Sequence, residues 1–236
     1  MRRTAMLLLA LLACLARPVA AQASIPAPVV IEDVVWEEIV PADGDGGGER
    51  FVATEAAATP RGLATFMATF GPFRVLDANR AALVDVTDAR SPAAFLAMLA
   101  AYPGIATVDM IDCPGTEDDR ANLALGRMIR ARGIATHVPA RGFVGSGAVE
   151  LFLAGAHRSA EAGAAFAVHS WQDEDGREPA DFAADAPENR VYIDYYRAMG
   201  MPPSQASAFY AMTNSVPFAG AKWMTAEQMR AWVGFD

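Results

Sequence analysis

A serine with glycine on both sides is the clearest candidate nucleophile in this sequence. Ser146 lies in the run Gly-Phe-Val-Gly-Ser-Gly, residues 142–147, just before an apolar segment that predicts a helix. Its small neighbours expose the hydroxyl, and the positive end of a helix dipole favours a nucleophile. The same position also suits a serine that caps the helix. Because the spacing is not that of the Gly-x-Ser-x-Gly elbow, the residues alone leave both interpretations open.

Two other segments contain residues that would complete such a site. Gly115, in the run Asp-Cys-Pro-Gly-Thr at 112–116, follows a predicted strand and permits a sharp turn with exposed amides, as an oxyanion hole requires. An ordinary turn between a strand and a helix has the same composition. His169 ends an alternating apolar stretch and is either a general base or a structural histidine.

Other residues whose side chains could take part in catalysis or bind a metal are weaker candidates. Cys113 follows a strand, but nothing near it in the sequence lowers the pKa of its thiol. His137 lies inside a predicted strand, where we expect packing, and His157 lies in a polar connection, where we expect exposure. The three histidines of the chain have no short ligand spacing, so we expect no metal site.

The elements that position these residues alternate between strand and helix. Strands are predicted at 82–86, 107–111, 134–138 and 164–168, and helices at 92–101, 118–132 and 146–156. This alternation predicts parallel strands joined by right-handed crossovers, with the candidate residues at strand ends. Three more helices, at 189–199, 204–213 and 225–232, predict a helical C-terminal region.

Composition narrows the functional classes. The 236 residues are 53% hydrophobic and 20% charged, which is typical of a folded globular chain. A net charge of −9 argues against nucleic acid as a partner, because phosphate binding needs a basic surface. Two cysteines exclude a disulfide-rich scaffold.

The N-terminus has the layout of an export signal. Arg2 and Arg3 precede an apolar run at 5–16, and Ala-Gln-Ala at 21–23 offers a cleavage site, so we predict a signal peptide over 1–23. The apolar run is too short to span a bilayer, and no later run reaches that length. A lipoprotein signal ending at Cys14 is the alternative, although Leu12 fits that pattern poorly. The sequence therefore predicts a periplasmic or secreted protein.

Residues 24–60 are predicted to form an N-terminal extension that precedes the main domain at 61–236. The Asp- and Gly-rich run at 43–49 has oxygen ligands suited to calcium, but it lacks the remaining ligands of a calcium loop. Its glycines favour a turn instead.

Taken in order, the segments from about residue 73 to 236 resemble the Clp-protease/crotonase superfamily. Residues 112–116 are similar to the family's Asn-Ser-Pro-Gly-Gly turn, and 125–133 to the helix that follows it. Ser146 and the later Ala154-Gly155 have the spacing of the family's serine proteases, with His169 beyond them. Residues 225–229 resemble a later Ser-Ala-x-Glu-Ala helix. The resemblance implies an α/β fold, a Clp/crotonase-like spiral of ββα units with a helical C-terminal region.

The resemblance also implies roles for individual residues. Ser146 is then the nucleophile and His169 the general base, and the amides of Gly115 or Thr116 with Gly147 form the oxyanion hole. The function implied is a secreted, peptidase-like serine hydrolase acting on peptides or on small esters and amides. No nucleotide motif is present, so we expect activity without ATP and without a cofactor. We do not expect the coenzyme A of the crotonase-like branch outside the cytoplasm. A homo-oligomer, either a trimer or a ring, is also implied.

Departures from the family pattern support a second hypothesis. Thr116 replaces the second glycine of the turn, and the acid expected just before Trp223 is missing. Asn214 is the nearest polar substitute to orient His169, and Asp194 is a more distant one. The alternative function is a catalytically degenerate scaffold that binds peptide or a partner protein in the former cleft.

An acidic stretch after His169 has two interpretations. Residues 173–175, Asp-Glu-Asp, would select a cationic substrate if they face the site. A solvated loop, which is the commoner role of such a run, is the interpretation that we favour.

Overall fold

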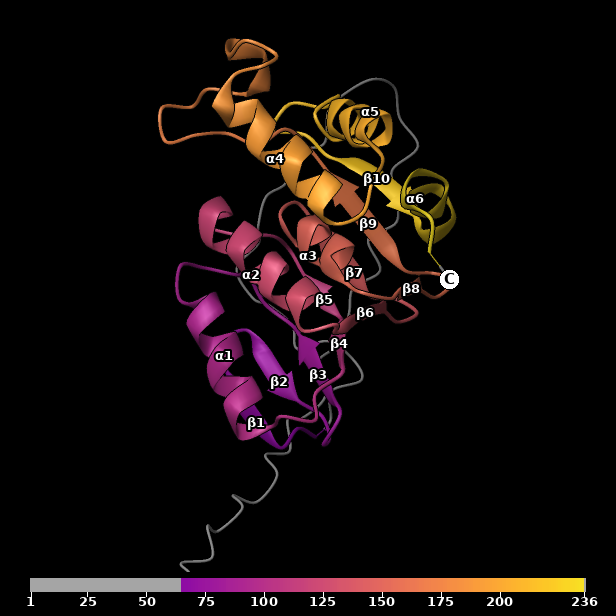
Figure 1. Ribbon diagram of the computed structural model, residues 1–236. Helices are drawn as coiled ribbons and strands as arrows, with labels where there is room; N and C mark the ends of the chain where they lie inside the picture. Colours follow the sequence, from indigo (N-terminus) through magenta and orange to yellow (C-terminus); the bar gives the residue numbers. More distant parts are fainter. Residues whose placement is uncertain (1–64, 236) are drawn as a thin grey trace, which may run out of the picture.

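The structure is a computed structural model that describes residues 65–235 (Figure 1). The predicted signal peptide at 1–23, the extension at 24–60 and the glycine-rich run at 43–49 lie outside the described residues. No helix in the described part is long and apolar enough to cross a membrane.

The larger sheet has six strands in the order β1-β2-β3-β4-β6-β8. A meander of β1 (Ala68–Phe70), β2 (Phe73–Val75) and β3 (Arg80–Leu83) pairs antiparallel. From β3 onward all pairs are parallel, through β4 (Thr107–Met110), β6 (Ala135–Val138) and β8 (Arg158–Ala160).

The smaller sheet has four strands in the order β10-β9-β7-β5. The strands β5 (Asp112–Cys113), β7 (Phe143–Gly145) and β9 (Ala165–Val168) are parallel, and β10 (Lys222–Thr225) pairs antiparallel with β9. Two successive units therefore place one strand in each sheet and then form a helix: β4-β5-α2 and β6-β7-α3. This arrangement confirms the predicted spiral of ββα units.

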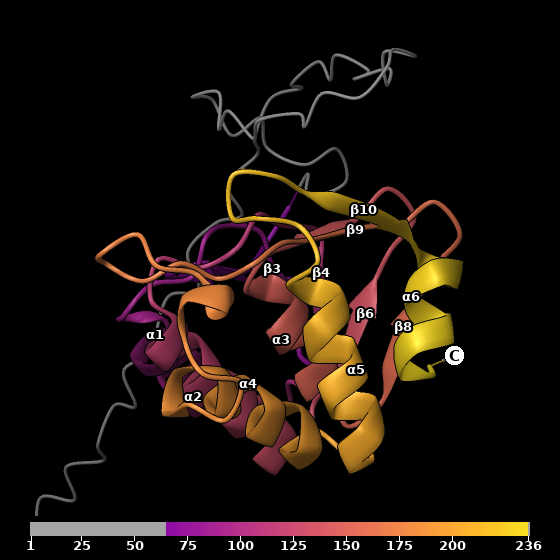
Figure 2. The same ribbon diagram turned by 90° about the horizontal axis from the view of Figure 1, so that it is seen from above.

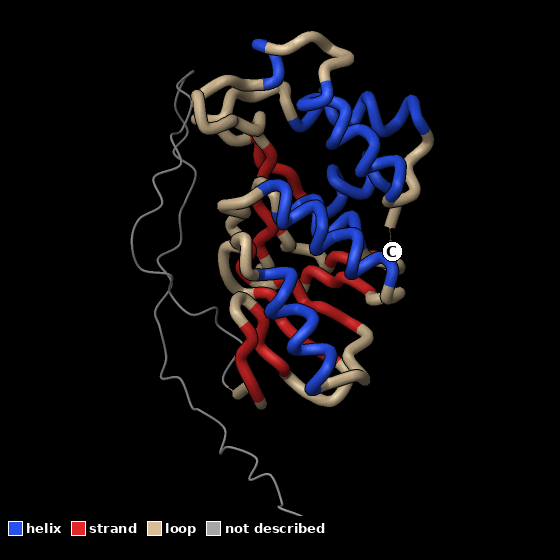
Figure 3. Tube along the Cα trace, turned by 60° about the vertical axis from the view of Figure 1, so that its left-hand side comes forward, coloured by secondary structure: helices blue, strands red, loops and turns tan. Residues whose placement is uncertain are grey.

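Three helices connect the strands, and the rest form the C-terminal region. The connecting helices are α1 (Ser91–Ala101), α2 (Asp119–Ala131) and α3 (Ala148–Ala154). They lie along one side of the strands (Figure 3). The C-terminal region contains a short 3₁₀ turn at Pro179–Asp181, then α4 (Pro187–Ala198), α5 (Pro203–Thr213) and α6 (Ala226–Val233). Figure 2 shows α4 and α5 on the same side of β9 and β10 as α3, with α6 packed next to β10.

Local sequence explains how α2 and α3 form and where they pack. The Asp118 side chain accepts a hydrogen bond from the amide of Ala121 and so caps α2. Gly133, with φ +65°, ends that helix. Every residue of α3 is buried, including the carboxylate of Glu150, because α2 and strands of both sheets pack against the helix and Tyr195 and Tyr196 of α4 hydrogen-bond to Glu150.

The predicted helices match the observed ones to within a few residues, whereas several strands were missed. The sequence predicts four strands in this region. The structure has further short strands there, among them β5 with two residues and β7 and β8 with three each. A segment of two or three residues is too short to show the alternation of apolar and polar residues that signals a strand.

Candidate active site

The residues predicted from three separate segments come together at one edge of the smaller sheet. The strands β5, β7 and β9 are parallel neighbours, so their carboxyl ends meet at the same edge. Thr116 follows β5, Ser146 with Gly147 follows β7, and His169 follows β9. All four residues line one pocket of about 240 Å³, which α4 and α5 complete.

Ser146 lies on a turn that the chain does not adopt freely. Its φ is +50°, which is uncommon for a residue with a side chain and which the two neighbouring glycines make possible. Its amide donates to the carbonyl of Ala167 on β9 at 2.9 Å, which anchors the turn to the sheet. The N-cap residue of α3 is Gly147. The side chain of Ser146 therefore does not cap this helix. The Ser146 hydroxyl has no hydrogen-bond partner between residues 65 and 235, and it faces the pocket.

Gly115 packs closely against the side chain of Ser146. A Cβ on Gly115 would be 3.0 Å from the Ser146 Cβ and 3.4 Å from its Oγ, and the φ of +148° favours glycine. The amides of Gly115, Thr116 and Gly147 donate to no acceptor in the described part of the chain. Backbone donors left unpaired beside a serine have the character of an oxyanion hole. The Thr116 side chain packs against Gly147 and donates to the carbonyl of Thr87 at 3.1 Å.

A buried asparagine that was not among the predicted site residues holds this arrangement together. Asn122 of α2 is 2% exposed, and its Nδ2 donates to the carbonyl of Gly147 at 2.6 Å. Its Oδ1 accepts from the hydroxyl of Thr87 at 2.9 Å, and the Thr87 amide donates to the carbonyl of Gly115. The hydrogen bonds made by Thr87 and Asn122 therefore connect the two sides of the candidate oxyanion hole. The sequence did contain a signal for this role: Asn122 is a polar residue next to the buried leucines of an amphipathic helix, where a side-chain amide needs hydrogen-bond partners.

The ring of His169 is oriented by the backbone. Its Nδ1 lies 2.8 Å from the carbonyl oxygen of Ser170. Since a carbonyl can only accept, Nδ1 of the neutral ring carries the hydrogen and Nε2 is left as the basic nitrogen. Phe218 packs edge-on against the ring, with 5.1 Å between ring centroids. No hydrogen bond joins His169 to Ser146 in the residues that the structure describes; such contacts are often loose without substrate.

The predicted contact between Asn214 and His169 is wrong in this structure. Asn214 does line the pocket, but it terminates α5, and its Nδ2 donates to the carbonyl of Tyr210 at 2.7 Å. The reason is that the last carbonyls of a helix lack partners, and Asn214 supplies one. Asp194 is no substitute, because it lies on α4 in an exposed pair with Arg197.

A carboxylate from another part of the chain lines the same pocket as His169. Asp119, the first residue of α2, lines the pocket and interacts electrostatically with His169. Burial raises the pKa of Asp119, opposed in part by a hydrogen bond from Tyr192 and by the charge of His169. Asp119 thus supplies negative charge near the imidazole without a hydrogen bond to it.

Two other expectations from the sequence are settled by burial and pairing. Cys113 is fully buried, its thiol donates to the carbonyl of Leu83 at 3.2 Å, and burial raises its pKa well above the ordinary value. Cys113 is therefore not a nucleophile. In the acidic loop, Arg177 pairs with Asp173 at 2.8 Å and with Asp175 at 3.0 Å, and none of the three acids lines the pocket of Ser146.

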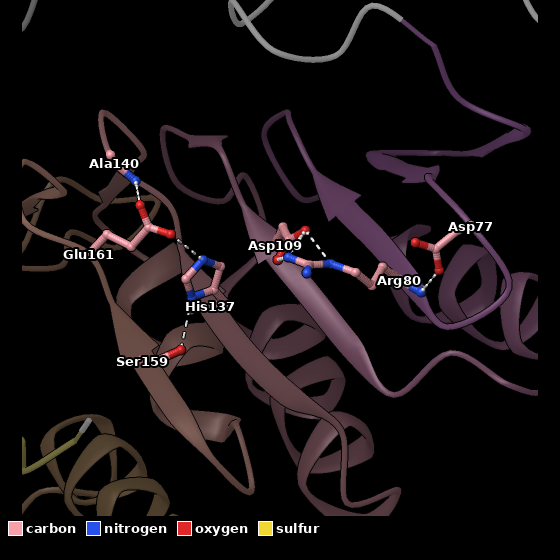
Figure 4. Close-up of polar contacts among 7 residues, drawn as sticks. All are labelled: Asp77, Arg80, Asp109, His137, Ala140, Ser159 and Glu161. Atoms are coloured by element: carbon pink, nitrogen blue, oxygen red, sulfur yellow. Dashed lines mark hydrogen bonds and ion pairs between the residues drawn. The ribbon is translucent and has the colours of Figure 1, made fainter.

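A second serine–histidine pair lies on the larger sheet (Figure 4). His137 of β6 has its Nδ1 2.8 Å from the hydroxyl of Ser159 on β8, and its Nε2 3.3 Å from Glu161. Glu161 also accepts from the amide of Ala140. His137 and Ser159 are register partners within the sheet, so their backbone lies in the strand ladder. Neither residue lines the pocket of Ser146. His157 is exposed, as predicted.

Comparisons with known proteins concern the fold. No protein-family model matches the chain, and a search of curated proteins finds no significant match. Among solved structures, a mutant of the 1510-N membrane-bound stomatin-specific protease in complex with a substrate peptide is 11% identical. It matches 67% of this chain and 74% of its own, with a TM-score of 0.44. The ClpP protease catalytic domain from Plasmodium falciparum is 13% identical and matches 66% and 81%, with a TM-score of 0.45.

Proposed function

We propose that this chain is an exported, ATP-independent serine hydrolase of the peptidase type. Ser146 is the nucleophile, His169 is the general base, and the substrate is a peptide or a small ester or amide. The observation that carries the proposal is the turn at Ser146. There an unpartnered hydroxyl on strained backbone faces a pocket beside unpaired amides and a histidine whose Nε2 is basic.

The chemistry needs only water as a co-reactant. The Ser146 oxygen attacks the substrate carbonyl carbon, and its proton passes to Nε2 of His169. The electron pair of the carbonyl moves to its oxygen, which the amides of Gly147 and of Gly115 or Thr116 stabilise. When the carbonyl re-forms, the bond to the leaving amine or alcohol breaks, and that group takes the proton from Nε2. Water then attacks the acyl-serine by the same steps, releasing the acid and restoring Ser146.

The surroundings of His169 predict a modest turnover. The carbonyl of Ser170 fixes the tautomer, but it carries no full charge to stabilise an imidazolium. Asp119, in the same pocket, is the carboxylate that we propose supplies that charge. The positioning and the electrostatic stabilisation of His169 therefore come from two different groups.

A fluorophosphonate probe tests the proposal directly. We expect covalent labelling of the wild-type protein that is lost in Ser146→Ala and strongly slowed in His169→Gln. Ser159→Ala is the matched control, since it removes the other serine that contacts a histidine, and it should label like the wild type. An unlabelled wild-type protein with a cooperative thermal transition would contradict the proposal.

The second candidate function is a catalytically degenerate scaffold that binds peptide or a partner protein in the same pocket. It is favoured by the missing hydrogen bond between Ser146 and His169 in the described residues, and by the absence there of a carboxylate in contact with the imidazole. In that case the probe does not label the protein, yet isothermal titration detects peptide binding that bulky substitutions at Gly147 abolish.

Export and assembly are separate parts of the proposal. N-terminal sequencing of protein from the periplasm or medium should begin at Gln22 or Ser24, whereas a lipid-modified Cys14 would favour the lipoprotein alternative. The mass in solution, measured by light scattering, should correspond to a homo-oligomer such as a trimer or a ring, and a monomer would remove that part.

A further inference from the structure

The pocket beside Ser146 is lined by acidic side chains rather than basic ones. Three carboxylates line it, on Glu117, Asp119 and Glu150, and none of its lining residues is lysine or arginine. Only His169 can carry a positive charge there. The acidic loop at 173–175 is a separate feature, in which Arg177 pairs with Asp173 and Asp175 and none of the three acids lines this pocket.

Glu150 is the most deeply placed of these carboxylates. It lies one helical turn after Ser146 on α3, is 7% exposed and faces the same pocket. Its Oε1 accepts a hydrogen bond from the hydroxyl of Tyr196 at 2.6 Å, and the carboxylate also accepts from its own backbone amide. A buried carboxylate without a cationic partner is relieved either by taking up a proton or by a cationic ligand, and a positively charged ligand would hold Glu150 ionised.

An orphaned acceptor lies on the wall of the same pocket. The Oδ1 of Asn214 is buried and has no hydrogen-bond partner among residues 65–235, while its Nδ2 is fixed by the carbonyl of Tyr210. The orientation of the amide is therefore set, and the acceptor is the end without a donor. Together with Glu150 and Asp119, the pocket presents acceptors from three different helices.

Aromatic rings complete the wall. Trp171 and Tyr192 are stacked at 6.0 Å with an interplanar angle of 11°, and Tyr192 and Tyr210 are stacked at 6.1 Å and 26°. All three residues line the pocket. Such faces attract cations and pack against alkyl chains. Carboxylates at depth with aromatic rings at the side match a side chain that has an apolar stem and a positive end.

We propose that this pocket binds the lysine or arginine side chain of the substrate, with Glu150 as the residue that determines specificity. The inference rests on the proposed function, because it places this side chain next to the bond that Ser146 attacks. Glu150 is the appropriate residue to test, because Asp119 also lines an adjacent pocket of about 310 Å³ and acts on His169.

The experiment compares two matched ester substrates that differ only in lysine or norleucine next to the scissile bond. Because a charge-assisted hydrogen bond is lost with norleucine, we expect kcat/KM to favour lysine by at least about 10-fold. Glu150→Gln keeps the shape and the contact with Tyr196, and it should reduce the preference to about 2-fold or less by the same reasoning. Glu227→Gln, an exposed change on α6, is the control and should keep the preference.

A binding measurement separates the failure of this inference from the failure of the proposed function. Titration of Ser146→Ala with the lysine and norleucine peptide amides reports the pocket without catalysis. Hydrolysis with equal kcat/KM for the two esters would overturn the inference and leave the hydrolase in place. No hydrolysis but tighter binding of the lysine peptide would overturn the hydrolase and support the pocket. Equal binding of both peptides by Ser146→Ala would overturn the pocket even if Glu150→Gln did not fold.

Discussion

The molecule contains two serine–histidine pairs, one on each sheet, and they differ in almost every property except residue type. Ser159 and His137 form a hydrogen bond of 2.8 Å, and Glu161 lies on the other side of the imidazole. Ser146 and His169 form none in the described residues, yet they share a pocket with unpaired backbone amides.

The difference lies in the backbone that carries each serine. Ser159 is in the middle of β8, where the amides of the strand belong to the ladder with β6 and no oxyanion hole can form. Ser146 follows β7 on a turn with positive φ, where the chain leaves the sheet and the next amide stays unpaired. A short serine–histidine distance is therefore a weaker sign of catalysis than donors placed for the developing negative charge.

The two single variants Ser146→Ala and Ser159→Ala should show the largest difference in hydrolysis. Removal of a serine nucleophile lowers turnover by about 10⁴-fold or more in enzymes of this type, so we expect Ser146→Ala to abolish measurable hydrolysis. Ser159→Ala should stay within about 2-fold of the wild type, since surface and half-buried hydrogen bonds act on stability. Steady-state hydrolysis of the lysine ester measures both. A large loss in Ser159→Ala alone would move the active site to the other sheet.

The carboxylates of the two regions should respond differently to pH. Burial raises the pKa of Glu150 to about 7, partly opposed by the hydrogen bond from Tyr196 and increased by the charge of Asp119. Because the folded state binds this proton more tightly than the unfolded state, the free energy of unfolding falls as pH rises from about 4.5 to about 7 and is level above.

Glu150→Gln should remove that fall. Relative to the wild type, the variant should gain on the order of 3 kcal/mol between pH 4.5 and pH 8, as a shift of this size implies. Urea denaturation at both pH values measures the difference. Glu161→Gln is the matched control, because the Glu161 side chain is 53% exposed. A parallel pH response of wild type and Glu150→Gln would show that Glu150 is not held in a proton-retaining site.

Two glycines with positive φ distinguish contact at the site from backbone strain. Gly115→Ala introduces strain and a Cβ 3.0 Å from that of Ser146, so we expect kcat to fall by about 10- to 100-fold, as when an oxyanion donor is displaced. Gly163→Ala has similar strain at φ +88°, but its Cβ would meet only the Arg141 amide at 3.9 Å. It should lower the melting temperature and leave kcat unchanged. Equal effects of both variants on kcat would indicate strain alone.

The smallest effect is expected at the pair of His137 and Glu161. This pair is partly exposed, with side chains 21% and 53% accessible, and such ion pairs contribute about 0.2–1 kcal/mol. Glu161→Gln should therefore lower the melting temperature only slightly, as thermal denaturation measures. A large drop in hydrolysis in this variant would contradict the assignment of the two pairs.

Much of the site was predictable because its signals are local. Ser146 between two glycines, Gly115 after a strand and His169 at the end of another are features of short segments, and the helix boundaries follow from caps and apolar periodicity. Parallel strands then bring the three segments to one edge. Asn214 failed as a prediction because its amide satisfies the end of its own helix, which lies closer than His169.

The sequence by itself determined the alternation of strands and helices, the order of the candidate catalytic residues and the unusual turns at Gly115 and Ser146. These depend on neighbours within a few positions. Only the tertiary structure decided which groups surround His169, that Asn122 joins the two sides of the oxyanion hole, and that Glu150 lies at depth beside the nucleophile. Burial and hydrogen-bond partners are set by residues far away in the chain, and no local pattern specifies which of them will meet.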